Sequence, residues 1–195
     1  MDKNIDILKV ITHADGGEDY AENATKYPAK ECCVGLRGYG VDCKDPAAAK
    51  EQFDSIAKYH GNDGKNQFIH FMMSFLKETA PDAETAMEIT DKTIEPLKEN
   101  HMILIGEHEK HREKSDFHTH NFVGTTDLES GKLLYPNNKL NYAKAQRMAD
   151  IIQKPVELVI EKKNKSPEPV GDGDNNTEKK KDFTRIFYPH KNTEG

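Results

Sequence analysis

"HMILIGEHEKHREKSDFHTHNFVGT", residues 101–125, contains two apolar segments separated by a charged one. The first includes the run Met-Ile-Leu-Ile at 102–105, and the second, 117–125, begins directly after Asp116. Short apolar runs of this kind are typical of β-strands, and a short polar connection favours antiparallel neighbours. We therefore expect these 25 residues to form an antiparallel strand pair inside a larger sheet.

The segments around this pair predict further strands and three helices. Residues 66–75 alternate so that one face is wholly apolar, as in a central strand. Residues 81–100 carry an apolar stripe at helical spacing, although Pro96 is expected to kink or shorten the end of that helix. The remaining expected elements are a first strand at 4–12, a long loop with short helical pieces at 13–43, a helix at 45–61, an edge strand at 130–136 and a last helix at 138–153.

The order strand, helix, strand, helix, hairpin, helix predicts an α+β fold in which helices cover a mostly antiparallel central sheet. With 195 residues, the chain has the length of one ordinary domain and a tail. We expect a main domain over residues 1–160 and a charged, flexible tail over 161–195. Residues 162–176 are rich in turn formers and predict disorder, whereas 182–190 contain enough apolar side chains to dock on the domain.

Composition excludes several classes of protein. The three cysteines, Cys32, Cys33 and Cys43, form no Cys-x-x-Cys pair, which argues against a disulfide framework and a four-cysteine zinc site. No apolar run is long enough for a membrane span, and the first residues do not resemble a signal peptide, so we expect a cytoplasmic protein without membrane partners. The net charge of −6 does not by itself favour nucleic-acid binding.

Histidines are concentrated in the strand pair, where five of the nine lie between positions 101 and 120. His118 and His120 are expected on one face of their strand, because strand side chains alternate with period two. Together with His108 or His111 they could bind one divalent ion and leave positions open for water or substrate. The alternative is that the histidines of the charged segment are merely solvated. The seven-residue spacing before His118 favours His111 as third ligand, and Glu113 could orient an imidazole.

Several segments, in order along the chain, resemble the relaxase or mobilisation nuclease domain of plasmids and conjugative elements, within the HUH group of endonucleases. The resemblance covers roughly residues 5–153. Its most specific part is the pattern His111-x6-His118-x-His120, which looks like the metal triad of that family. The other matching segments are "DYAENATK" at 19–26, "YGVDC" at 39–43, "HFMMSF" at 70–75 and "GTTDLESGKLL" at 124–134.

This resemblance implies a site- and strand-specific endonuclease that nicks single-stranded DNA at a transfer origin through a covalent 5′-phosphotyrosine. Tyr20 is the nucleophile implied by position, and Tyr27 is the second candidate. Glu113 is implied as a supporting catalytic residue, and Mg²⁺ or Mn²⁺ as the metal. Accessory DNA-binding proteins and a secretion coupling protein are possible partners. The candidate DNA contacts, chosen by proximity in sequence, are Lys26, Arg37, Arg112, Lys132 and Arg147.

Two other functions remain open on the sequence. A non-catalytic DNA-binding or replication-accessory protein could retain the same fold. A metal-dependent phosphoesterase could use the paired histidines for hydrolysis, although a barrel enzyme of the amidohydrolase kind would need about 250 residues.

Overall fold

The computed structural model describes residues 4–11, 25–29, 33–109, 117–161 and 183–191. They form a seven-stranded sheet in the order β2-β4-β5-β3-β1-β6-β7. All neighbouring strands are antiparallel except β1 and β6, so the predicted α+β fold with a mostly antiparallel sheet is confirmed. The strands are β1 (Asp6–Ile11), β2 (Cys33–Tyr39), β3 (Phe68–Ser74), β4 (Ile103–Glu109), β5 (Phe117–Gly124), β6 (Val156–Ile160) and β7 (Phe183–Phe187).

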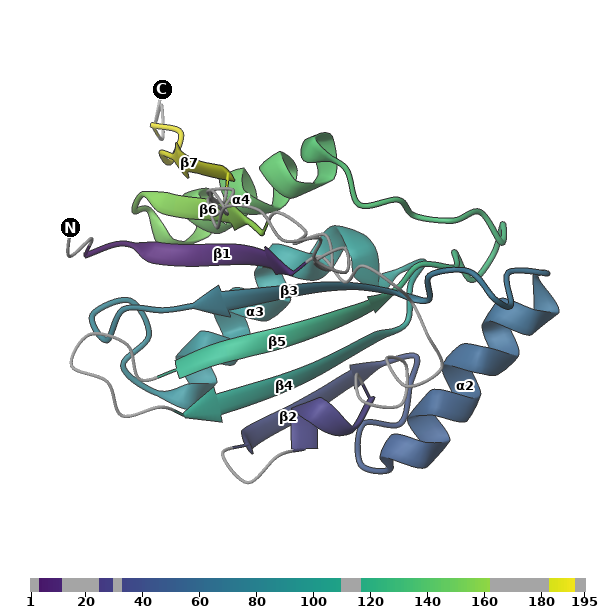
Figure 1. Cartoon of the computed structure of the whole chain (residues 1–195). Coiled ribbons are helices and arrows are strands. Elements are labelled where there is room, and N and C mark those ends of the chain that lie inside the picture. The colour runs from purple at the N-terminus through teal and green to yellow at the C-terminus, as the bar shows by residue number, and fades with distance from the viewer. Residues whose placement is uncertain (1–3, 12–24, 30–32, 110–116, 162–182, 192–195) are drawn as a thin grey trace, which may run out of the picture.

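Three α-helices and one short 3₁₀ helix have both ends within the described residues. They are η1 (Tyr27–Ala29), α2 (Pro46–Tyr59), α3 (Ala83–Lys98) and α4 (Asn138–Ile152). Each α-helix begins after a residue whose side chain accepts hydrogen bonds from first-turn amides, namely Asp45, Asp82 and Asn137. Figure 1 shows α3 and α4 behind the sheet and α2 beside one end of it. No helix among the described residues is long and apolar enough to cross a membrane.

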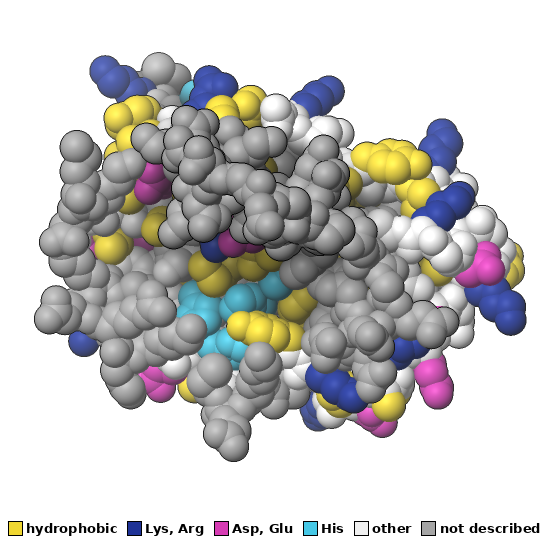
Figure 2. Space-filling view, in the orientation of Figure 1, with side chains coloured by type: hydrophobic (Ala, Val, Ile, Leu, Met, Phe, Trp, Pro, Cys, Tyr) yellow, Lys and Arg dark blue, Asp and Glu magenta, His cyan; other side chains and the backbone are white. Residues whose placement is uncertain are grey.

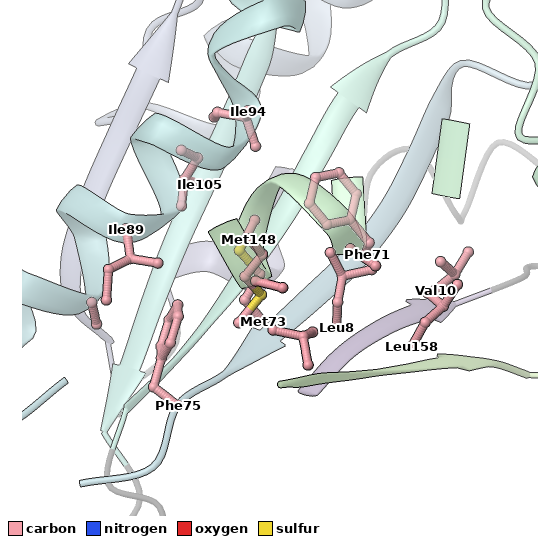
Figure 3. Close-up of a cluster of buried hydrophobic side chains, with 14 of the residues drawn as sticks. Leu8, Val10, Phe71, Met73, Phe75, Ile89, Ile94, Ile105, Met148 and Leu158 are labelled. Carbon is pink, nitrogen blue, oxygen red and sulfur yellow. The ribbon is translucent and has the colours of Figure 1, made fainter. Parts of the chain in front are cut away.

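The main hydrophobic core lies between the sheet and the α3/α4 layer (Figure 3). Leu8, Phe71, Met73 and Ile105 point from alternate positions of their strands toward the helices, and Met148 of α4 packs among them. A smaller cluster lies on the opposite face, where α2 covers one end of the sheet. The rest of that opposite face is not covered by α3 or α4.

The two faces of β5 have different roles. Thr119 points toward α3, where its hydroxyl lies 3.0 Å from that of Thr90. His118 and His120 therefore point to the opposite face, because successive strand residues alternate. This face carries η1 and α2, and it is the face toward the viewer in Figure 1.

Pro96 lies inside α3 without ending it, since the helix continues to Lys98. A proline has no amide hydrogen, so the carbonyl of Lys92, four residues earlier, loses its helical partner. Arg147 of α4 supplies a replacement, because its Nε donates to this carbonyl at 2.7 Å. The helix therefore ends only two residues before position 100, where the sequence predicts its end.

Other expectations for the secondary structure need correction. The edge strand expected at 130–136 is wrong, because the only pairing there among the described residues is an isolated bridge between Thr126 and Leu133. The segment expected to be a loop, 13–43, contains the strand β2, and β6 was not expected at all. Residues 183–187 do dock on the domain, as β7 paired with β6.

Candidate metal centre

His108, His118 and His120 form a buried cluster on the face opposite α3 and α4. His108 of β4 lies directly opposite His118 of β5 in the antiparallel register. One ring nitrogen from each of the three lies within 4.8 Å of the others, and the exposed fractions are 1%, 6% and 5%. Figure 2 shows the histidine side chains, in cyan, gathered in a hollow beside hydrophobic side chains. Three converging imidazoles of this kind fit a divalent ion with coordination positions left for substrate.

The third member of this cluster is His108, whereas the sequence favoured His111. The strand β4 extends to Glu109, so the alternation of Leu104, Gly106 and His108 brings His108 to the same face as the pair on β5. His111 lies outside the described residues and stays a prediction. The signal that could have selected His108 is the hairpin register, which places it opposite His118.

A backbone carbonyl fixes the orientation of His108. Its Nε2 lies 3.1 Å from the carbonyl oxygen of Pro28, and a carbonyl can only accept, so Nε2 carries the hydrogen and donates. An ion held by His108 would therefore bind Nδ1. Such outer hydrogen bonds commonly set the tautomer of a ligand histidine.

Gly106 allows η1 to approach closely enough for that hydrogen bond. A Cβ at Gly106 would lie 2.4 Å from the Cα of Pro28, a distance that real Cβ contacts do not show. The contacting atom is backbone, which cannot rotate away as a side chain could. The glycine is therefore required for the carbonyl of Pro28 to reach His108.

We predict that Gly106→Ala weakens divalent-metal binding by about 10- to 100-fold, the usual cost of losing an outer-sphere partner. The added methyl group displaces Pro28, and the hydrogen bond to His108 is lost. The matched control is Gly124→Ala, on the same face of the neighbouring strand, where the new methyl meets the ring of Phe53 at 3.0 Å. Mn²⁺ titration should show normal affinity in this control; equal affinity of both variants would contradict the role given to Pro28.

His70 of β3 contacts the cluster from the other side. Its Nε2 lies 3.1 Å from Nδ1 of His120. Its ring is stacked on that of Phe122, with a centroid distance of 4.1 Å and an interplanar angle of 22°. An ion held by His120 would therefore bind Nε2, because Nδ1 is engaged with His70.

Tyr27, the second candidate nucleophile, lies beside the cluster. Its half-buried ring packs edge-on against His120, with a centroid distance of 4.6 Å, and lies 5.5 Å from the ring of His108. The predicted site residues that lie outside the described residues are Tyr20, His111, Arg112 and Glu113.

The structure brings one of the four described basic candidates close to the cluster. Lys26 is exposed and directly precedes Tyr27. Lys132 is exposed in the turn beyond the Gly124 end of β5, away from His118. Arg37 forms an ion pair with Asp91 of α3, and so lies on the face opposite the histidines. Arg147 also lies there, bonded to α3.

Glu107 is one of the two acidic residues next to His108 in sequence, the other being Glu109, but alternation directs it to the α3 face. Its side chain is buried, and desolvation raises its pKa to about 7 although Arg37 opposes this. The candidate centre is therefore built from imidazoles, with no carboxylate from the described residues in the group of possible ligands.

Comparison with protein families matches residues 20–158 to the family described as "Relaxase: MobA/VirD2-like, nuclease domain". The matched range contains the three clustered histidines, His70 and both candidate tyrosines. Neither the comparison with curated proteins nor that with solved structures finds a match.

Proposed function

Because the chain belongs to the relaxase family of MobA/VirD2-like nuclease domains, we propose that it nicks single-stranded DNA at a transfer origin through a covalent phosphotyrosine. This step would initiate plasmid mobilisation or conjugative transfer. The observation that carries the proposal is the buried cluster of His108, His118 and His120 on a sheet face that α3 and α4 leave uncovered. Family membership supports a relaxase-type nuclease, and the histidine cluster supports metal-assisted chemistry.

The three histidines would hold a divalent cation, Mn²⁺ or Mg²⁺. Such a cation stabilises the negative charge that develops on the nonbridging oxygens of the scissile phosphate. Imidazole ligands suit transition metals better than Mg²⁺, which prefers oxygen ligands, so we expect Mn²⁺ to bind more tightly of the two. Two of the ligand rings have their orientation set by Pro28 and His70.

The tyrosine hydroxyl oxygen would attack the phosphorus, and the bond from phosphorus to the 3′ oxygen would break. The 5′ phosphate stays on the tyrosine, whose hydroxyl gives up its proton, and the departing 3′ oxygen takes up one proton to become a hydroxyl, so that protons balance. The phosphotyrosine bond keeps the energy of the broken linkage, so the strand can be resealed without ATP. Tyr20 is the proposed nucleophile from the family resemblance. Tyr27 is second, supported by its ring contact with His120.

Of the described basic candidates, Lys26 is the one best placed to contact a DNA phosphate near the centre, because it is exposed and adjoins Tyr27. Basic side chains and aromatic rings are the usual contacts of single-stranded DNA. Accessory DNA-binding proteins and a secretion coupling protein are proposed partners on the family resemblance alone.

The test is incubation with single-stranded oligonucleotides that tile the transfer origin of the element encoding the protein, in the presence of Mn²⁺. We predict an adduct of protein and DNA that survives denaturant, and its loss in Tyr20→Phe. Tyr27→Phe is the matched variant, since it removes one hydroxyl from the same segment, and it should retain the adduct. Loss of the adduct in Tyr27→Phe but not in Tyr20→Phe would identify Tyr27 as the nucleophile.

Two outcomes would contradict the proposal. Cleavage without an adduct would favour a hydrolytic phosphoesterase, whose nucleophile is water. A shift in DNA mobility with neither cleavage nor adduct would favour a non-catalytic DNA-binding protein of the same fold.

A further inference from the structure

His70 is a fourth buried histidine at the centre, outside the group of three whose ring nitrogens converge. We infer that His70 is a positioning residue, which fixes the ring nitrogen that His120 presents to a metal ion. The inference rests on the metal-binding part of the proposed function. It concerns binding of the ion and needs no assumption about the nucleophile.

The strand register and a stacked ring restrict the orientation of His70. His70 lies opposite Phe122 in the pairing of β3 with β5, and the neighbouring pair is Met72 with His120. His70 therefore reaches His120 along the diagonal of the strand pair. The ring stacked on Phe122 keeps the Nε2 of His70 directed at the Nδ1 of His120, 3.1 Å away.

A count of hydrogens shows what this contact does. One hydrogen lies between the two nitrogens. If it belongs to Nδ1 of His120, then Nε2 of that neutral ring has a lone pair and can bind a cation, while His70 accepts the hydrogen bond. If instead the hydrogen belongs to His70, a neutral His120 carries its hydrogen on Nε2 and cannot bind through that atom. Metal binding therefore selects the arrangement in which His70 is the acceptor.

Two substitutions at His70 separate hydrogen bonding from packing. The amide group of glutamine can reach the position of Nε2, whereas the shorter asparagine places its amide near Nδ1. We predict that His70→Gln binds Mn²⁺ nearly as tightly as the wild type and that His70→Asn binds about 10- to 100-fold more weakly. The affinity is measured without DNA, from the electron paramagnetic resonance signal of free Mn²⁺.

Equal affinities in His70→Asn and the wild type would overturn the inference. Equally weakened Mn²⁺ binding in His70→Gln and His70→Asn would also overturn it, because the loss would then follow from packing alone. Thermal unfolding without metal must first show that both variants are folded. If the variants do not fold, the nitrogen-15 spectrum of the wild type with Zn²⁺ decides. A hydrogen on Nδ1 of His120 supports the inference, and one on its Nε2 overturns it. Failure to nick DNA with normal Mn²⁺ binding would count against the proposed function only.

Discussion

His108→Ala should abolish high-affinity Mn²⁺ binding, whereas His111→Ala should leave it unchanged. Loss of a residue that only hydrogen-bonds to a ligand lowers metal affinity by up to roughly 100-fold. Loss of one of three ligands should lower it by more. His108 is the proposed third ligand, because the register places it opposite His118 and its ring nitrogen lies close to those of His118 and His120. Calorimetric titration of the metal-free protein with Mn²⁺ compares the two variants directly.

His101→Ala is the control for removing a buried histidine that lies just before β4. His101 is buried, but its Nδ1 lies 2.9 Å from the carbonyl of Gly124, at the end of β5 away from His118. This variant should lose stability and keep its Mn²⁺ affinity. Normal binding in His108→Ala together with lost binding in His111→Ala would restore the ligand set that the sequence favoured.

The paired histidines were readable from sequence because period-two alternation is a local property of one strand. The place of His108 beside them was not, because it depends on how β4 pairs with β5 and on how far β4 extends toward Glu109. The contribution of Pro28 was even less accessible. The hydrogen bond from His108 to Pro28 joins residues 80 positions apart, and it requires the glycine at position 106. The need for this glycine becomes visible only when η1 is placed against β4.

The strand β2 shows why a segment rich in glycine resembles a loop in sequence. Glycine is depleted in strands, and β2 contains Gly35 and Gly38. Gly38 is explained by a close neighbour, because a Cβ at this position would lie 2.3 Å from the backbone carbonyl oxygen of Val41. Tertiary packing here outweighs intrinsic propensity, which sequence patterns alone do not reveal.

The second large effect is expected on stability, from Lys144→Met. Lys144 lies on α4 with its side chain 4% exposed, and its Nζ has no hydrogen-bond partner among the described residues. Burial lowers its pKa to about 7. The Nζ lies 4.0 Å from the ring centroid of Phe71, but a cation–π contact supplies only about 2 kcal/mol and does not offset desolvation.

A pKa near 7 in the folded state, against 10.5 in the unfolded state, means that the unfolded chain binds more protons between those values. The free energy of unfolding should therefore rise as the pH increases from about 7 to 10. Glu107 has the opposite effect at lower pH, because its pKa is raised from 4.5 to about 7 in the folded state. Its contribution to the free energy of unfolding therefore falls as the pH increases between those two values. Measurements at pH 7.5 to 10 isolate the lysine.

Methionine fills a similar volume without a charge, so Lys144→Met should raise the free energy of unfolding at pH 7 by roughly 3–5 kcal/mol. The rise with pH above 7 should also disappear. Chemical denaturation at several pH values measures both, and Lys139→Met, at an exposed position in the first turn of the same helix, should change neither. If Lys144→Met were less stable than the wild type and kept the slope, the ammonium group would have to be charged and solvated inside the fold. The burial of Lys144 against Phe71 would then be wrong.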